Sequence, residues 1–136
     1  MYLVWTSLLC YGIACLLPAY KSTEENKQAT FAGLSCLLFG WFSFNVPMFL
    51  AWLANIAYAI SITLVFFSHR HTFAFTLSIA AFILAFFALK VNFLPKNEGG
   101  DMLEVRISYG FYVWIMSFSI LVFHLLFINF YQIQPL

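Results

Sequence analysis

Charged residues are scarce in this chain of 136 residues: six are basic, five are acidic, and together they make up 8% of the sequence. A water-soluble domain carries about a quarter charged residues, because its surface must stay solvated. The net charge of +1 also provides no basic surface for the phosphates of a nucleic acid. Few charges and 64% hydrophobic residues predict a chain whose main partner is the lipid bilayer.

Carboxylates are absent from the long apolar stretches. Residues 1–20, 28–69, 71–89 and 107–136 contain no Asp, Glu, Lys or Arg. Proton-coupled exporters and ion pumps need a carboxylate inside the membrane to bind and release protons. Their absence argues against a small multidrug exporter.

Cofactor, metal and thiol-redox motifs are also missing. The cysteines are Cys10, Cys15 and Cys36, with no Cys-x-x-Cys among them. On a helix, Cys10 and Cys15 point roughly 140° apart and cannot pair. The N-terminus has no basic residue before its first apolar stretch, so we expect that stretch to remain as a membrane anchor rather than a cleaved signal peptide. We predict no cofactor and no metal.

Long apolar segments dominate what is present, and they predict an all-α fold, a polytopic membrane helix bundle forming one domain over residues 1–136. As a single helix the uncharged stretch 28–69 would span about 63 Å, roughly twice the hydrocarbon core, so it must fold back, with the break at 40–47. Aromatic residues near the segment ends fit an interfacial belt. The expected four to five segments are 2–17, 30–44, 47–67, 72–89 and 105–130.

The segment 30–44 is short, so it either crosses a thin bilayer or is re-entrant. With five crossings the basic residues divide equally between the two sides. With four crossings, the polar loops 21–27 and 90–106 share one side, which the positive-inside rule places in the cytoplasm, and the orientation stays open. The spacing of Asp101 and Glu104 predicts a capping box that starts the last helix.

Three polar residues fall within or beside the apolar segments: Asn45, Asn55 and His124. Asn55 shares a helical face with Ala51 and Ala59, where its amide can bond across helices or contribute to partner docking. Small residues at 81, 85 and 88 provide a similar face. We interpret the intramembrane His124 as a hydrogen-bonded packing residue, with a proton relay or haem ligand as the alternative. The turn residues His69 and His71 are poor partners for it at that depth.

The polar segment 90–106 is the expected place for recognition outside the membrane. No histidine, serine nucleophile or glycine-rich phosphate cradle accompanies its acidic residues, so we predict that the protein is not an enzyme. The candidate partner-recognition residues are Lys96, Asn97, Glu98, Asp101 and Glu104.

Several short strings carry a family resemblance. They are Leu17-Pro18-Ala19-Tyr20, Leu50-Ala51-Trp52-Leu53-Ala54-Asn55, Asn97-Glu98-Gly99-Gly100 and Ser108-Tyr109-Gly110. In this order they resemble a loose group of small bacterial multi-pass inner-membrane proteins without an assigned activity. Members often carry Cys and Pro where this chain has Lys21 and Ile56, so no loop disulfide is implied. The resemblance implies a bacterial inner membrane and transfers no catalytic residue.

Two functional hypotheses follow. The first is a small integral membrane protein that acts through helix–helix association, as an accessory subunit or as an immunity-type protein against a membrane-active toxin. Its partner would be another membrane protein or a second copy of the chain. The alternative is a small oligomeric channel or carrier for an uncharged or anionic solute, lined by Asn45, Asn55, Ser61, Thr63 and His124.

Overall fold

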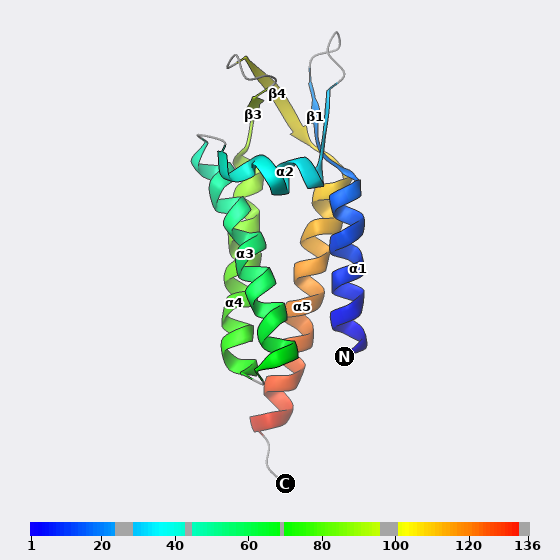
Figure 1. Ribbon diagram of the computed structural model, residues 1–136, viewed down its shortest axis with the longest axis vertical. Helices are drawn as coiled ribbons and strands as arrows, with labels where there is room; N and C mark the ends of the chain where they lie inside the picture. Colours follow the sequence, from blue (N-terminus) through cyan, green and yellow to red (C-terminus); the bar gives the residue numbers. More distant parts are fainter. Residues whose placement is uncertain (24–28, 43–44, 69, 96–100, 134–136) are drawn as a thin grey trace.

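Helices form most of the chain in the computed structural model, which describes residues 1–23, 29–42, 45–68, 70–95 and 101–133 (Figure 1). The elements in order are α1 (Tyr2–Leu16), β1 (Pro18–Ser22), β2 (Thr30–Ala32), α2 (Gly33–Phe39), the 3-10 helix η1 (Gly40–Phe42), α3 (Val46–Phe67), α4 (His71–Ala85), the 3-10 helix η2 (Phe86–Lys90), β3 (Phe93–Pro95), β4 (Met102–Ile107) and α5 (Tyr109–Ile133).

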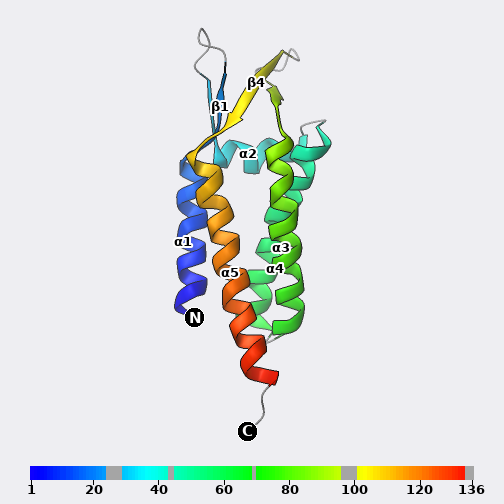
Figure 2. The same cartoon turned by 180° about the vertical axis from the view of Figure 1, so that it is seen from behind.

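Four helices run side by side as a bundle. α1 packs along α5, α3 along α4, and α4 along α5, and views from front and back agree on this arrangement (Figures 1 and 2). Three stretches, Val46–Phe67, His71–Lys90 and Tyr109–Tyr131, are long and apolar enough to cross a membrane, while Tyr2–Leu16 is shorter. The expected segments 2–17 and 47–67 match α1 and α3 to within one residue at each end, and 72–89 matches α4 and η2 together.

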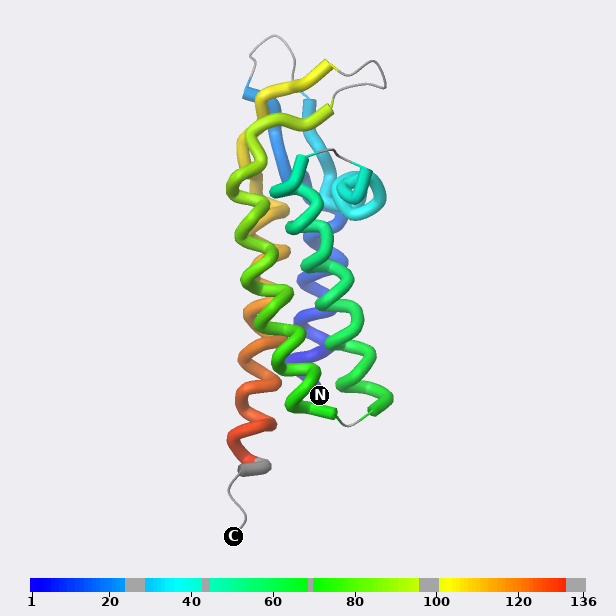
Figure 3. Tube along the Cα trace, turned by 90° about the vertical axis from the view of Figure 1, so that its left-hand side faces the viewer, coloured from blue at the N-terminus to red at the C-terminus, as the bar shows by residue number. Residues whose placement is uncertain are grey.

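The segment 30–44 neither crosses along the bundle nor dips into it. Its first residues pair as β2, and the remaining helical turns, α2 and η1, lie across one end of the bundle (Figures 1 and 3). At 1.5 Å per residue these turns extend only about 15 Å. The indole of Trp52 in α3 holds α2 in place by donating a hydrogen bond of 2.8 Å to the carbonyl of Leu37.

The expectation of an all-α fold is wrong, because four antiparallel strands form a sheet in the order β2-β1-β4-β3. The segment 90–106, expected as a loop, supplies β3 and nearly all of β4, while β1 and β2 stand on either side of the expected loop 21–27 and β1 includes its first two residues. In β4, Leu103 and Val105 are buried while Glu104 and Arg106 are exposed. This period of two is a strand pattern, so the capping box predicted at Asp101 and Glu104 is also wrong, and the last helix begins at Tyr109.

The described residues of both polar segments lie at one end of the bundle, called the sheet end below, as the four-crossing alternative requires. β1 pairs with β4, so the chain after α1 and the chain before α5 meet in one sheet (Figure 1). Lys21, Lys90 and Arg106 belong to this end. Arg70 is the N-cap residue of α4, whose first turn lies at the opposite end of the bundle (Figure 1).

The buried residues fall into two clusters. One lies within the bundle and includes Phe118, Leu121 and Leu125 of α5. The other lies between bundle and sheet and includes Tyr20, Met48 and Leu103. The small residues expected to share helical faces are mostly used inside the chain, although Ala59 is exposed rather than buried. Small side chains at these buried positions let the helices approach closely: Ala51, Ala54, Ala74, Ala81, Ala85 and Ala88.

Candidate functional site

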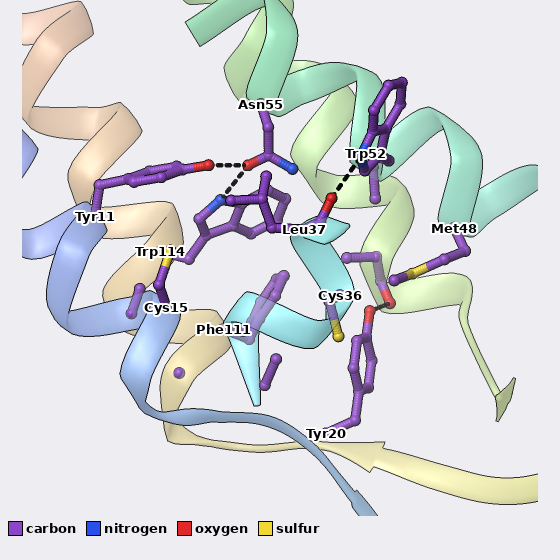
Figure 4. Close-up of a pocket in the computed structure, with 16 residues that line it drawn as sticks. Tyr11, Cys15, Tyr20, Cys36, Leu37, Met48, Trp52, Asn55, Phe111 and Trp114 are labelled. Carbon is purple, nitrogen blue, oxygen red and sulfur yellow. Dashed lines mark hydrogen bonds between the residues drawn. The ribbon is translucent and has the colours of Figure 1, made fainter. Parts of the chain in front are cut away.

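Asn55 is the point at which three helices of the bundle are joined by polar contacts. Its Oδ1 accepts a hydrogen bond of 2.8 Å from the hydroxyl of Tyr11 in α1. The same oxygen accepts a second bond of 2.9 Å from the indole Nε1 of Trp114 in α5 (Figure 4). The prediction that this amide bonds across helices is therefore confirmed, and one acceptor satisfies two donors.

A second polar layer lies further from the sheet. The hydroxyls of Ser7 and Tyr58 are 2.7 Å apart, and Ser7 also donates a bond of 2.7 Å to the carbonyl of Ser117. Both serines are fully buried. The ring of Tyr58 contacts the rings of Tyr11 and Phe118, with centroid distances of 4.9 and 4.8 Å, and those two rings are 6.3 Å apart, so the three form one aromatic cluster.

These contacts take the place of close backbone packing between α1 and α3. Each of these two helices packs mainly along a different partner, and long side chains bridge the space between them. A third bridge is the contact of Trp5 with Phe66, whose ring centroids are 5.5 Å apart. Directed hydrogen bonds fix the rotation of α1 against α3 more strictly than apolar contacts, which have no preferred direction.

Tyr58→Phe isolates the contribution of this second layer. Phenylalanine keeps the ring stacking with Tyr11 and Phe118, and Ser7 keeps its bond to the carbonyl of Ser117. We expect a loss of about 0.5–1.5 kcal/mol in unfolding free energy, the net value of one hydrogen bond. Reversible unfolding in mixed detergent micelles measures it. Tyr2→Phe is the matched control, since Tyr2 is 91% exposed; equal losses in both variants would contradict the assignment.

A small cavity lies between the Asn55 cluster and α2. It has a volume of about 50 Å³, and its walls come from α1, α2, α3 and α5 (Figure 4). Pockets for drug-sized ligands are about 300–1,000 Å³, whereas a water molecule occupies about 30 Å³ in the liquid. The cavity is thus well below the size of a pocket for a drug-sized ligand. The residues that line it, labelled in Figure 4, include Tyr11, Cys15, Cys36, Asn55 and Trp114.

The side chains at the α2 edge of the cavity are poor reagents for catalysis. Burial raises the pKa of the Cys36 thiol to about 12, so it is protonated at neutral pH and a weak nucleophile. Burial, with Cys36 nearby, also raises the pKa of the Tyr20 hydroxyl. That hydroxyl donates a bond of 3.0 Å to the carbonyl of Ala88, which ties β1 to the end of η2.

His124 is buried in α5, at 7% exposure, and its Nε2 has no hydrogen-bond partner within the described residues. The interpretation as a hydrogen-bonded packing residue therefore finds no support at Nε2. His71 is the first residue of α4, at the end of that segment, as expected. Its carbonyl accepts a long bond of 3.4 Å from Nδ2 of Asn129, which lies five residues beyond His124 in α5.

The remaining predicted residues do not join Asn55 or His124. Asn45 is the N-cap residue of α3, without a side-chain capping bond, at the sheet end. Glu104 is exposed in β4 and Asp101 is exposed just before it. Lys96, Asn97 and Glu98 lie outside the described residues. Among the described residues, no group of three or more His, Cys, Asp or Glu side chains could hold a metal ion.

The residues that sequence reasoning missed are the donors around Asn55. Neither Tyr11 nor Trp114 was singled out from the sequence, nor was Ser7 in the second polar layer. The available signal was their polar atoms, because a hydroxyl or indole N–H inside an apolar helix needs an acceptor.

No family model, curated protein or solved structure matches the chain.

Proposed function

We propose that the protein is an integral membrane protein whose helix bundle holds a small β-sheet at one surface of the bilayer, where the sheet binds a membrane-protein partner. It would act without catalysis, as an accessory subunit or an immunity-type protein. The family resemblance adds the bacterial inner membrane to this proposal. One observation carries it: the outside of the bundle is apolar, while charged residues project from the outer face of the sheet.

The exposed surface of the helices supports the membrane location. Large apolar side chains on every bundle helix are exposed, including Leu9, Ile60, Ile83 and Phe123. In water, so much exposed apolar surface would cause aggregation, whereas in lipid it costs nothing. Aromatic residues predicted for the interfacial belt are all more than half exposed: Tyr2, Trp5, Trp41, Tyr109, Tyr112 and Tyr131.

The outer face of the sheet supports a binding role. Glu104 and Arg106 project from β4, and Phe93 and Met102 are each at least half exposed beside them. Glu104 pairs with Phe93 across β3 and β4. Charged and apolar side chains on a rigid sheet are the composition of a recognition surface. The small-residue faces are occupied inside the bundle, so we assign recognition to the sheet rather than to them.

The channel hypothesis receives less support. Ser61 donates a bond of 2.7 Å to the carbonyl of Ala74, and Thr63 bonds the carbonyl of Ala59 in its own helix. Asn55 is engaged by Tyr11 and Trp114. Three of the five side chains that would line a channel therefore already bond within the chain.

Site-specific photo-crosslinking in cells tests the proposal. A photoreactive residue at Phe93 or Met102 should give the same protein adduct, and one at Tyr2, at the opposite end, should not. Glu104→Arg should reduce the adduct from both sheet positions, because it reverses the charge between them. An adduct at twice the chain mass of 15.7 kDa identifies a second copy as the partner. Adducts from Tyr2 alone would contradict recognition by the sheet.

A further inference from the structure

Two like charges are paired across the middle of the sheet. Lys21 in β1 lies directly opposite Arg106 in β4, and both side chains are exposed. Like charges at directly opposed positions of an antiparallel pair repel and destabilise the sheet. The pair is therefore costly unless an anion lies between or above the two cations.

The described carboxylates do not supply that anion. Glu104 is the nearest in β4, two residues before Arg106, but it opposes Phe93 rather than either cation. Neither Lys21 nor Arg106 forms an ion pair within 4.0 Å in the described part of the chain. The side chains of Lys21 and Arg106 are thus available to bind an anion from outside the chain.

Two exposed tyrosines lie directly below the pair on α5. Lys21 Nζ is 5.2 Å from the ring centroid of Tyr109, and Tyr109 is 71% exposed. Tyr112 follows one turn later and is 64% exposed, so both rings are on one helix face. Exposed apolar residues continue this face along the helix, including Met116 and Phe123.

Backbone contacts hold these groups in fixed positions. The N–H of Ser108 donates a bond of 2.8 Å to the carbonyl of Ala19, which joins β4 to β1 beside Lys21. A Cβ at Gly110 would lie 2.9 Å from the carbonyl oxygens of Leu17 and Pro18, so the start of α5 fits closely against the end of α1. Figure 2 shows β4 leading directly into α5 at this corner.

We propose that Lys21, Arg106 and Tyr109 form a binding site for the phosphate of an anionic phospholipid headgroup. The guanidinium and ammonium groups bind the phosphate oxygens, and the tyrosine rings lie at the depth of the glycerol region, above the apolar face of α5. A lipid is favoured over a free anion because the apolar stripe continues from the cations toward the bilayer centre. This site depends on the membrane location in the proposed function, not on partner binding.

Thermal unfolding in a neutral detergent provides the test. Short-chain phosphatidylglycerol should raise the Tm of the wild-type protein more than phosphatidylcholine or inorganic phosphate at equal concentration. The double variant Lys21→Gln/Arg106→Gln should lose at least half of that rise. Lys90→Gln is the matched control and should keep it, since Lys90 also lies over an aromatic ring, at 5.4 Å from Phe87, but does not belong to the pair.

The same variants distinguish a lost site from a damaged fold. Without lipid, the double variant should be at least as stable as the wild type, because the repulsion between the cations is removed. An equal rise with phosphatidylglycerol in all three proteins would overturn the site. An equal rise from inorganic phosphate would overturn the lipid assignment. Recovery of the protein from cells without detergent would instead contradict the membrane location, and with it the proposed function.

Discussion

Asn55→Ala is expected to lower the free energy of unfolding by about 1–3 kcal/mol. The substitution removes the single acceptor used by both Tyr11 and Trp114. A buried donor left without a partner costs about 1–3 kcal/mol, although interhelical bonds in membranes average nearer 0.6 kcal/mol each. Because α1 and α5 both lose their polar link to α3, we expect the loss of unfolding free energy to lie in the upper half of this range. Reversible unfolding in mixed detergent micelles measures the loss, and the fluorescence of Trp114 reports the local change.

Asn45→Ala is the matched control for this variant. Asn45 has the same side chain and is the N-cap residue of the same helix, α3, but its side chain forms no capping hydrogen bond. We expect its effect to stay within about 0.5 kcal/mol, as for substitutions away from packing and bonding features. A double-mutant cycle with Tyr11→Phe should show coupling of at least 0.5 kcal/mol, on the order expected for residues in contact. Additive effects in that cycle would contradict the hydrogen bond between Tyr11 and Asn55.

Gly33→Ala is expected to displace α2 from the bundle. A Cβ at Gly33 would collide with the backbone carbonyl oxygen of Ala14 and lie 3.1 Å from the Cα of Cys15. Neither atom belongs to a flexible side chain, so the backbones must separate. The N–H of Gly33 also donates a bond of 2.9 Å to the carbonyl of Leu17, which the movement would weaken. Overpacking of this kind costs about 1–3 kcal/mol.

Maleimide labelling of Cys36 measures the displacement directly. Cys36 lies one turn from Gly33 in α2, and burial keeps its thiol protonated, so the wild-type protein should react slowly at pH 7. In the Gly33→Ala variant the thiol becomes exposed and labelling should accelerate. Gly12→Ala is the control, because nothing lies within 4 Å of a Cβ there; alanine should leave labelling unchanged and favour the helix slightly. Similar labelling in both variants would contradict the close fit.

The sequence predicted the features that depend on local composition. Uninterrupted apolar runs identified the bundle helices, and the first expected segment, 2–17, stops just before Pro18, which cannot continue a regular helix. Asn55 was identified because a lone amide in an apolar segment needs partners. These arguments use only neighbouring residues or helical spacing.

The sheet was not predicted, because its stability comes from pairs that are distant in the sequence. β2 and β3 are three residues each, too short for a periodic signal. Only β4 has a clear alternation of buried and exposed residues, and it was masked by the resemblance of Asp101 and Glu104 to a capping box. The donors to Asn55 were missed for a similar reason: the rotation of α1 and α5 about their axes cannot be read from a uniformly apolar sequence.

The pairing of β1 with β4 has a consequence for the order of assembly. Tyr20 pairs with Ile107, so a strand that leaves the ribosome early has its partner next to the last helix. The α3–α4 hairpin involves only neighbouring segments and can form as soon as both helices exist, whereas α1 must wait for α5. During synthesis the first helix therefore spends most of the translation time without its principal neighbour. The bundle and the sheet are therefore completed only after β4 and α5 have been synthesised. A ribosome that stops before residue 107 leaves β1 without its full partner strand.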